Sequence, residues 1–218
     1  MCGRYSALTE EEIIEIREVI REVSLRIAAD ELGVGDVPDG AARRGEVFPT
    51  DVAPVIIGAG DAAVSFENLR WGFKKWDGKG VIINARSETV ETKGMFKHLL
   101  AVGRCVVPAG EYYEWKAEGK KKVKHFIKDA AGHILFMAGL YRDTPDGREF
   151  VILTKEAVGG AEKIHDRMPV LLRANQMEDW LGGTLPIDVV VEPDFNVMVV
   201  PCVPDAPAAD GFMQMTLH

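Results

Sequence analysis

Short runs of β-branched and aromatic residues, separated by Gly, Asp and Pro, fill most of the sequence between residues 54 and 153. Val, Ile and aromatic side chains favour strands, whereas Gly, Asp and Pro favour the turns between them. The pattern therefore predicts a fold dominated by antiparallel strands. The expected strands cover residues 54–57, 63–66, 81–84, 105–107, 112–115, 123–128, 133–140, 150–153, 170–172, 187–191 and 197–200.

Helical patterns are fewer and lie mainly outside this stretch. Thr9 and Glu12 have the spacing of a capping box, and helical periodicity continues from Glu10 to about Leu32. Shorter helices are expected over residues 94–102 and 174–181, a loop over 33–44, and a turn at 145–147. We therefore predict a single α+β domain over residues 1–218, with loop or extended chain over 201–218.

The charge balance limits the classes of partner that the chain can have. The sequence has 26 Lys and Arg against 34 Asp and Glu, a net charge of −8. Phosphate neutralisation supplies most non-specific affinity for nucleic acid, so a generally basic nucleic-acid binder is disfavoured. A local basic groove on an acidic body remains compatible with this balance.

Cysteine content and hydropathy indicate the compartment. The three cysteines, Cys2, Cys105 and Cys202, are an odd number without metal-type spacing, which disfavours a disulfide framework or a metal site. No apolar run is long enough to cross a bilayer, and the first residues lack the apolar stretch of a signal peptide. We expect a cytoplasmic protein without a membrane partner.

The second residue of the sequence, Cys2, offers unusual chemistry. Removal of Met1 would leave it with a free α-amine and a thiol on adjacent carbons. Reference pKa values of about 7.7–8.0 for the amine and about 8.5 for the thiol leave both partly nucleophilic at neutral pH. An aldehyde condenses with the amine to a Schiff base, and the thiol then closes a five-membered thiazolidine. A cysteine that merely occupies a frayed terminus is the alternative interpretation.

The segment Glu111–Trp115 places a carboxylate among aromatic residues. Alternate side chains of a strand point to opposite faces, so Tyr112 and Glu114 share one face while Tyr113 and Trp115 share the other. A carboxylate that faces a partly closed interior has a raised pKa and suits acid–base chemistry. The alternative is a glutamate that faces solvent beside core aromatics.

Two further segments combine groups that bind or transfer protons. Asn84 and Arg86 follow an apolar strand, where an amide and a fixed positive charge can hold a ligand or simply form a turn. His165 precedes Asp166 and Arg167, which offers a proton shuttle next to a planar guanidinium suited to phosphate. A turn in which the histidine and the aspartate bond each other is the alternative.

Taken in order, these segments resemble the SRAP (SOS-response-associated peptidase) family of abasic-site processing proteins. The similarity runs from residue 1 to about residue 181. Its motifs are Met1–Tyr5, Arg70–Gly72, Asn84–Thr89, Arg104–Pro108, Tyr113–Trp115, Ala138–Leu140 and His165–Pro169. The segment Gly45–Thr50 departs from the pattern that the family usually shows, as does the segment after Gly72.

The resemblance implies an open, barrel-like arrangement of antiparallel strands, flanked by helices and cut by a DNA groove. It also implies a covalent thiazolidine between Cys2 and an abasic site in single-stranded DNA. Asn84 would hold the amino terminus and the sugar, Glu114 would assist ring opening, and His165 would serve a lyase step. DNA contacts are implied for Gly3, Arg4, Trp71, Arg86 and Arg167, with phosphates bound by the arginines, while the tryptophan would sit against a base or close the groove.

The resemblance further implies an autopeptidase activity that removes Met1. Because no metal site and no nucleotide-binding glycine loop is apparent in the sequence, we expect no cofactor and no metal, and we expect a monomer. Two other functions fit part of the pattern. An amino-terminal-nucleophile hydrolase or amidotransferase would also use Cys2, with its thiol attacking an amide. A non-catalytic module that binds damaged single strands would use the arginines and aromatics without a covalent step.

Overall fold

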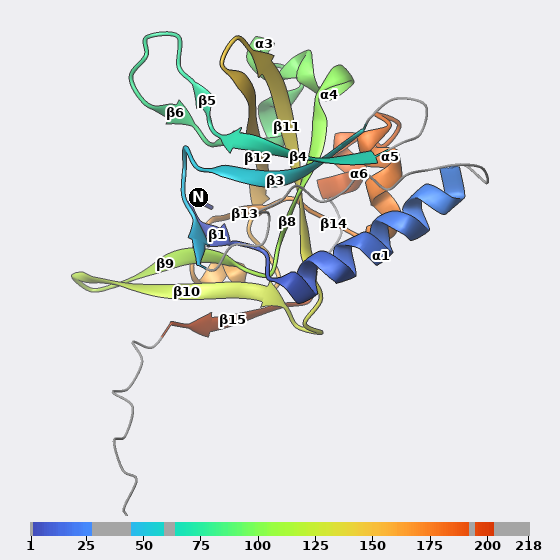
Figure 1. Cartoon of the computed structure of the whole chain (residues 1–218). Helices are drawn as coiled ribbons and strands as arrows, with labels where there is room; N and C mark the ends of the chain where they lie inside the picture. The colour runs from blue at the N-terminus through green and yellow to red at the C-terminus, as the bar shows by residue number, and fades with distance from the viewer. Residues whose placement is uncertain (1, 28–44, 59–63, 192–194, 203–218) are drawn as a thin grey trace, which may run out of the picture.

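The computed structural model describes residues 2–27, 45–58, 64–191 and 195–202 (Figure 1). Most of these residues belong to two sheets, one of eight strands and one of five, with a separate two-stranded hairpin. Helices lie at the upper and right-hand edges of the sheets as drawn in Figure 1. The expected α+β fold is therefore confirmed.

A closed ring of strands forms the centre of the eight-stranded sheet. Each of its five strands pairs with the next, and the last pairs with the first. Around the ring these strands are β3 (Val52–Gly58), β4 (Val64–Trp71), β12 (Gly147–Glu156), β11 (Leu135–Thr144) and β8 (Arg104–Ala109). Three short strands extend it, β7 (Asn84–Arg86), β13 (Arg167–Pro169) and β14 (Leu171–Leu172).

The five-stranded sheet carries the amino end of the chain. Its order is β15 (Val197–Pro201), β10 (Lys121–Asp129), β9 (Tyr112–Glu118), β1 (Tyr5–Ser6) and β2 (Glu46–Val47). The hairpin of β5 (Phe73–Lys74) and β6 (Val81–Ile82) projects from the body at the upper left of Figure 1. This hairpin continues directly from β4.

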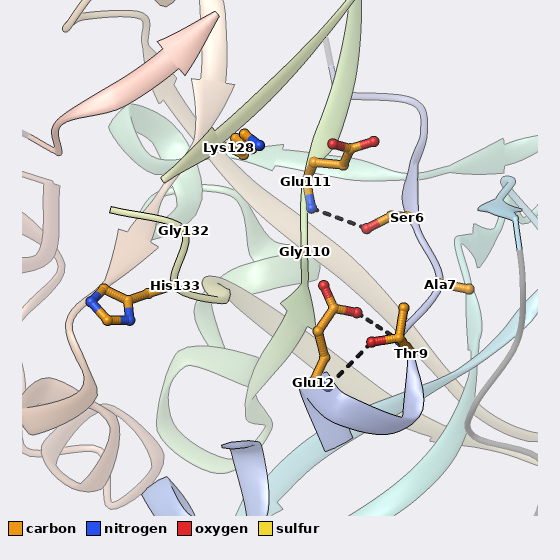
Figure 2. A pocket seen from close by; sticks show the side chains of 9 residues that line it. All are labelled: Ser6, Ala7, Thr9, Glu12, Gly110, Glu111, Lys128, Gly132 and His133. Carbon is orange, nitrogen blue, oxygen red and sulfur yellow. Dashed lines mark hydrogen bonds between the residues drawn. The ribbon is translucent and has the colours of Figure 1, made fainter. Parts of the chain in front are cut away.

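The helix α1 (Glu10–Ile27) begins with the expected capping box. Thr9 N–H donates to Glu12 Oε2 at 2.7 Å, and Glu12 N–H donates to Thr9 Oγ1 at 3.2 Å (Figure 2). These two bonds satisfy amide donors that a helix start leaves unpaired. The other helical segments are short: α2 (Ser87–Val90), α3 (Gly94–Lys97), α4 (Leu99–Val102), η1 (Ala161–Lys163), η2 (Ala174–Gln176), α5 (Met177–Leu181) and α6 (Ile187–Val191).

Three strands of the ring, β8, β11 and β12, are buried on both faces over most of their length, which explains their nearly continuous apolar sequence. Val106 and Val151 belong to a core cluster that also includes Ile16 of α1. Val107 and Ile152, their neighbours along the strands, belong to a second cluster that includes Cys2. Successive side chains of a strand point to opposite faces, so the ring separates a helix-covered core from the core beneath the amino end.

The predicted strand over residues 187–191 is wrong, because this segment forms the helix α6. Ile187 and Val190, three residues apart, are buried, while Val189 is 45% exposed. This spacing fits one turn of helix, and Pro186 suits the residue that precedes it. The β-branched composition of this segment favoured the two-residue period of a strand, whereas its buried residues follow the period of a helix.

Other boundaries differ less from expectation. The helix predicted over 94–102 is split into α3 and α4, and that over 174–181 begins as the 3-10 turn η2. The turn at 145–147 is confirmed by the pairing of Thr144 with Gly147. The end of the first helix beyond Ile27, the loop over 33–44 and the tail over 203–218 lie outside the described residues.

Gly139 on β11 allows two strands of the ring to approach closely. A Cβ added there would lie 2.8 Å from Cys105 Sγ and 2.9 Å from the Val151 carbonyl oxygen. Gly139→Ala should therefore destabilise the fold by about 1–3 kcal/mol, which thermal unfolding would report as a Tm lower by roughly 2–4 °C per kcal/mol. Gly94→Ala is the control, because no heavy atom lies within 4 Å of its added Cβ. Equal Tm values for the two variants would contradict this packing.

Candidate active site at the amino-terminal cysteine

Cys2 lies inside the molecule rather than at a frayed end. Its side chain is 0% exposed, and its thiol faces the Arg4 carbonyl oxygen at 3.8 Å. The strand β1 holds this end in place, because Tyr5 pairs with Val47 on one side and with Tyr112 on the other. The backbone of the first residues is thus part of a sheet.

Asn84 binds the backbone of Cys2 directly. Its Nδ2 donates to the Cys2 carbonyl oxygen at 2.8 Å, although 82 positions separate the two residues. The parallel pairing of β7 with β12, in which Asn84 lies opposite Ile152, places the amide there. Asn84 Oδ1 is buried and has no hydrogen-bond partner in the described part of the chain. It is thus available to accept a hydrogen bond from a bound group.

Burial controls the protonation of the thiol. It raises the pKa of Cys2 well above its usual range, and the negative charge of Glu114 raises it further. Burial is the larger cause, because a thiolate loses its hydration in an apolar surrounding. The group at this site is therefore a thiol at neutral pH, and it needs a base before it can attack.

Glu114 supplies a buried carboxyl whose charge acts on this thiol. Tyr112 and Glu114 are 0% and 4% exposed, and they share the inner face of β9, as the alternation predicted. Burial raises the pKa of the Glu114 carboxyl, while the positive charge of His165 opposes the shift. A carboxyl with a raised pKa holds its proton closer to neutral pH, which suits a general acid that later acts as a base.

His165 lies between a short 3-10 turn and β13, and its side chain is 30% exposed. Its Nδ1 accepts the Arg167 backbone N–H at 2.9 Å and also lies 2.7 Å from Asp166 Oδ1. The first contact needs a lone pair on Nδ1, whereas the second needs a hydrogen on Nδ1. Nδ1 therefore has a partner in either tautomer of the ring.

Two hydroxyls that the sequence analysis missed belong to the same cluster. Tyr5 and Tyr112 are buried cross-strand neighbours, and neither hydroxyl has a hydrogen-bond partner among the described residues. Burial raises the pKa of both phenols, and a thiolate at Cys2 would raise it further. Two protonated phenols therefore belong to the core cluster that contains Cys2.

The residues expected to contact DNA lie in different surroundings. Gly3 is partly buried, and Arg86 is exposed at the end of β7. Arg167 forms a two-pronged ion pair with Glu88, at 2.6 and 2.9 Å, and its Nη2 donates to the Thr154 carbonyl oxygen at 2.7 Å. These bonds position Arg167 within the fold.

Arg4 pairs with Glu46 at 2.9 Å. The Tyr113 backbone N–H donates to the Arg4 carbonyl oxygen, which places Arg4 level with Tyr113. The alternation along β9 then puts the Arg4 side chain on the face opposite Tyr112 and Glu114.

Trp71 is not available to contact a base in this structure, which corrects the expectation for this residue. Its side chain is 0% exposed, its Nε1 donates to the Ile83 carbonyl oxygen at 3.0 Å, and its ring lies 5.1 Å from that of Tyr5. It packs beneath the amino end and supports β1. Trp76, in the turn between β5 and β6, is 96% exposed and is flanked by exposed Lys75. An aromatic residue within a Lys- and Gly-rich turn was the sequence signal that could have identified Trp76 as an exposed aromatic side chain.

A hollow of about 320 Å³ lies elsewhere, between the start of α1 and the ends of β9 and β10 (Figure 2). Its polar groups already have partners: Glu12 caps α1, and Ser6 Oγ accepts the Glu111 N–H at 3.0 Å. Cys2 does not line it. The hollow is therefore explained by the fold. No three metal-binding side chains gather within the ranges that the structure describes.

Solved structures share this fold. A protein from Bacteroides thetaiotaomicron superposes with a TM-score of 0.72 at 21% identity, covering 92% of this chain and 91% of that one. A phage-related protein from Bordetella bronchiseptica superposes with a TM-score of 0.67 at 25% identity, covering 92% and 94%. The architecture therefore defines a known class of α+β proteins with a five-strand ring.

Sequence comparison identifies the class. The family model described as "SOS response associated peptidase (SRAP)" matches residues 1–191, so this chain belongs to the SRAP family. The abasic site processing protein YedK of Escherichia coli is 31% identical over 190 residues, covering 83% of this chain and 79% of that protein. The abasic site processing protein YoqW of Bacillus subtilis is 32% identical over 199 residues, covering 84% and 80%.

The raised pKa of Glu114 has a measurable effect on stability. The folded chain favours the protonated form of Glu114. The contribution of this residue to folding stability is therefore fully present below its pKa in the unfolded chain, and it is lost as pH rises through its pKa in the folded chain. Glu114→Gln mimics the protonated form. The variant should melt roughly 2–4 °C above the parent at about pH 8, equivalent to ~1 kcal/mol, and the two should converge near pH 4.

Glu118→Gln, an exposed change on the same strand, is the control for this comparison and should show no such pH dependence. If the parent were more stable than Glu114→Gln at about pH 8, the fold would stabilise the ionised carboxylate of Glu114, contrary to this account.

Proposed function

We propose that this protein captures abasic sites in single-stranded DNA as a covalent thiazolidine on Cys2. The observation that carries the proposal is the buried Cys2, whose carbonyl is held by Asn84 at 2.8 Å and whose thiol is influenced by the charge of the buried Glu114 carboxyl. The names of the relatives YedK and YoqW, abasic site processing proteins, support the same substrate.

The chemistry begins with the sugar. An abasic site exists mainly as a closed hemiacetal, so a proton must move before the aldehyde is exposed. Protonated Glu114 is suited to assist this opening, because its pKa is raised by burial. Asn84 Oδ1, which is buried and free to accept, is suited to hold a sugar hydroxyl or the terminal amine.

The capture itself has two bond-forming steps. Once Met1 is removed, the α-amine of Cys2 adds to the aldehyde carbon and the carbinolamine loses water to give the Schiff base. The thiol then adds to the imine carbon, which forms the C–S bond while the thiol proton ends on nitrogen. Because the pKa of Cys2 is raised, this transfer needs a relay, and the Glu114 carboxylate is suited to take the proton from sulfur and pass it to nitrogen.

His165 is assigned the lyase step within this proposal. Strand cleavage removes a proton from the sugar next to the Schiff base and expels the 3′ phosphate. A neutral imidazole can take that proton, and the contact with Asp166 then stabilises the imidazolium. Removal of Met1 by the chain itself is the peptidase activity that we propose alongside, since it would prepare the same amine.

Two exposed groups are suited to hold a strand. Arg86 offers a positive charge, and Trp76 offers a large aromatic face that is 96% exposed. Aromatic stacking and a few cations bind single strands without reading their sequence. We assign to Trp76 the base contact that was expected of Trp71.

Replacement of Cys2 tests the covalent step. Cys2→Ser leaves the amine and the shape of the residue but removes the thiol that closes the ring. On single-stranded DNA that carries one uracil and has been treated with uracil glycosylase, the parent should give a heat-stable protein–DNA band on a denaturing gel. The variant should not. Cys105→Ser is the control, because Cys105 is equally buried but has no α-amine. A heat-stable band of equal intensity from Cys2→Ser would contradict the proposal.

Replacement of Trp76 tests the strand contact separately from the chemistry. Trp76→Ala should weaken equilibrium binding of lesion-free single-stranded DNA by roughly fivefold, the effect of losing ~1 kcal/mol of stacking. Trp76→Phe retains an aromatic face and should recover most of the affinity. Fluorescence anisotropy with labelled oligothymidine gives both values. Equal affinity of the parent and Trp76→Ala would show that Trp76 does not contact the bound DNA.

A further inference from the structure

The outer face of the five-stranded sheet carries a group of cations and aromatic rings that the site above does not use. It consists of the side chains on the opposite face from Tyr112 and Glu114. Trp115 lies directly across from Lys124, and Arg4 lies level with Tyr113. We call this group the outer cluster; its members are Arg4, Glu46, Phe48, Tyr113, Trp115 and Lys124.

Two cations of the outer cluster converge on a single carboxylate. Arg4 Nη1 lies 2.9 Å from Glu46 Oε2, and Lys124 Nζ forms an ion pair with Glu46 Oε1. The side chains are 29%, 23% and 24% exposed for Arg4, Glu46 and Lys124, respectively. All three are therefore within reach of a ligand from solvent.

Aromatic rings hold both cations in place. The Arg4 guanidinium lies 4.2 Å from the centre of the Phe48 ring and 4.9 Å from that of Trp115. Lys124 Nζ lies 3.9 Å from the centre of the Tyr113 ring. Cation–π contacts of this kind fix a positive charge without neutralising it. The position between the two cations is consequently preformed for an anion with two oxygens.

A phosphodiester group has the same features as the carboxylate that now fills this position. It carries one negative charge, and its two non-bridging oxygens can accept from an arginine and a lysine together. Phe48 is 42% exposed at the edge of the cluster, so a base next to that phosphate would meet an aromatic surface. The outer cluster thus combines a position for a phosphate with an aromatic surface for a base, the two features by which proteins bind single-stranded nucleic acids.

We propose that Lys124 joins Arg4, whose phosphate contact the family resemblance already implies, in a second phosphate subsite for single-stranded DNA, and that Glu46 occupies this subsite as an intramolecular competitor. This inference rests on the proposed function, because it assigns a further contact to the same strand. A phosphate enters only by displacing the Glu46 carboxylate, so the parent gains little from its two cations. Glu46 therefore sets the affinity of the chain for DNA outside the lesion.

The test is equilibrium binding of lesion-free labelled oligothymidine, measured by anisotropy over a range of salt concentrations. Glu46→Gln keeps the shape of the side chain and removes the competing charge. It should bind about fivefold to tenfold more tightly than the parent at low salt, with a salt slope steeper by about 0.7–1.4, the value for one or two added phosphate contacts.

Matched variants separate this subsite from a general change in net charge. Glu67→Gln removes the same charge and breaks a comparable ion pair, with Arg148, on β4. It should change the affinity less than twofold. In the Glu46→Gln background, Lys124→Ala should abolish the gain, whereas Lys128→Ala should preserve most of it, because Lys128 lies four positions further along β10 with its Nζ over the Phe126 ring.

The outcomes divide cleanly between the two proposals. Tighter binding by Glu46→Gln alone, lost with Lys124, supports the subsite. Unchanged or weaker binding by a Glu46→Gln protein whose Tm shows it folded, an equal gain from Glu67→Gln, or no measurable binding by any variant would overturn it. Cross-linking of the parent to an abasic strand is scored separately. Failure of the subsite with intact cross-linking leaves the proposed function standing, and loss of cross-linking identifies failure of the function itself.

Discussion

The pairing of β1 with its neighbours is the interaction on which the candidate site depends. Terminal residues of a chain usually fray because few backbone bonds hold them. Here Tyr5 pairs with strands on both sides, the Tyr113 N–H donates to the Arg4 carbonyl, and Asn84 binds the Cys2 carbonyl at 2.8 Å. These bonds bring the second residue of the chain into a core, so its α-amine and thiol acquire a fixed position relative to side chains far along the sequence.

Burial of the amino end also sets the chemistry. It raises the pKa values of the Cys2 thiol and the Glu114 carboxyl together, so both groups keep their protons nearer to neutral pH. A protonated acid is what sugar opening requires, and a thiol that ionises only when a base is present reacts late. In the proposed mechanism this arrangement favours an order in which the amine reacts first and the thiol second. The same burial that positions the proposed nucleophile would then delay its attack until an imine exists.

Local patterns in the sequence predicted local structure well. The capping box at Thr9 and Glu12, the turn before Gly147 and the inward side of Glu114 each depend on neighbouring residues, which periodicity and turn chemistry describe. Features that depend on distant strands were not predictable in this way. The parallel pairing that brings Asn84 to Cys2, the burial of Trp71 and the outward direction of Arg4 come from how the ring and the second sheet pack. The segment 187–191 failed because its β-branched composition outweighed a spacing that fits a single helical turn.

The central claim is that the α-amine and the thiol of Cys2 both bond to the sugar carbon. Mass spectrometry of the nuclease-trimmed, trypsin-digested adduct, with and without borohydride, tests it most directly. The account predicts that the modification maps to the terminal Cys2–Arg4 peptide, with a mass equal to the peptide plus the opened sugar fragment minus one water, unchanged by borohydride. A mass that rises by two hydrogens after borohydride, showing an open Schiff base, or a modification on a lysine would contradict it.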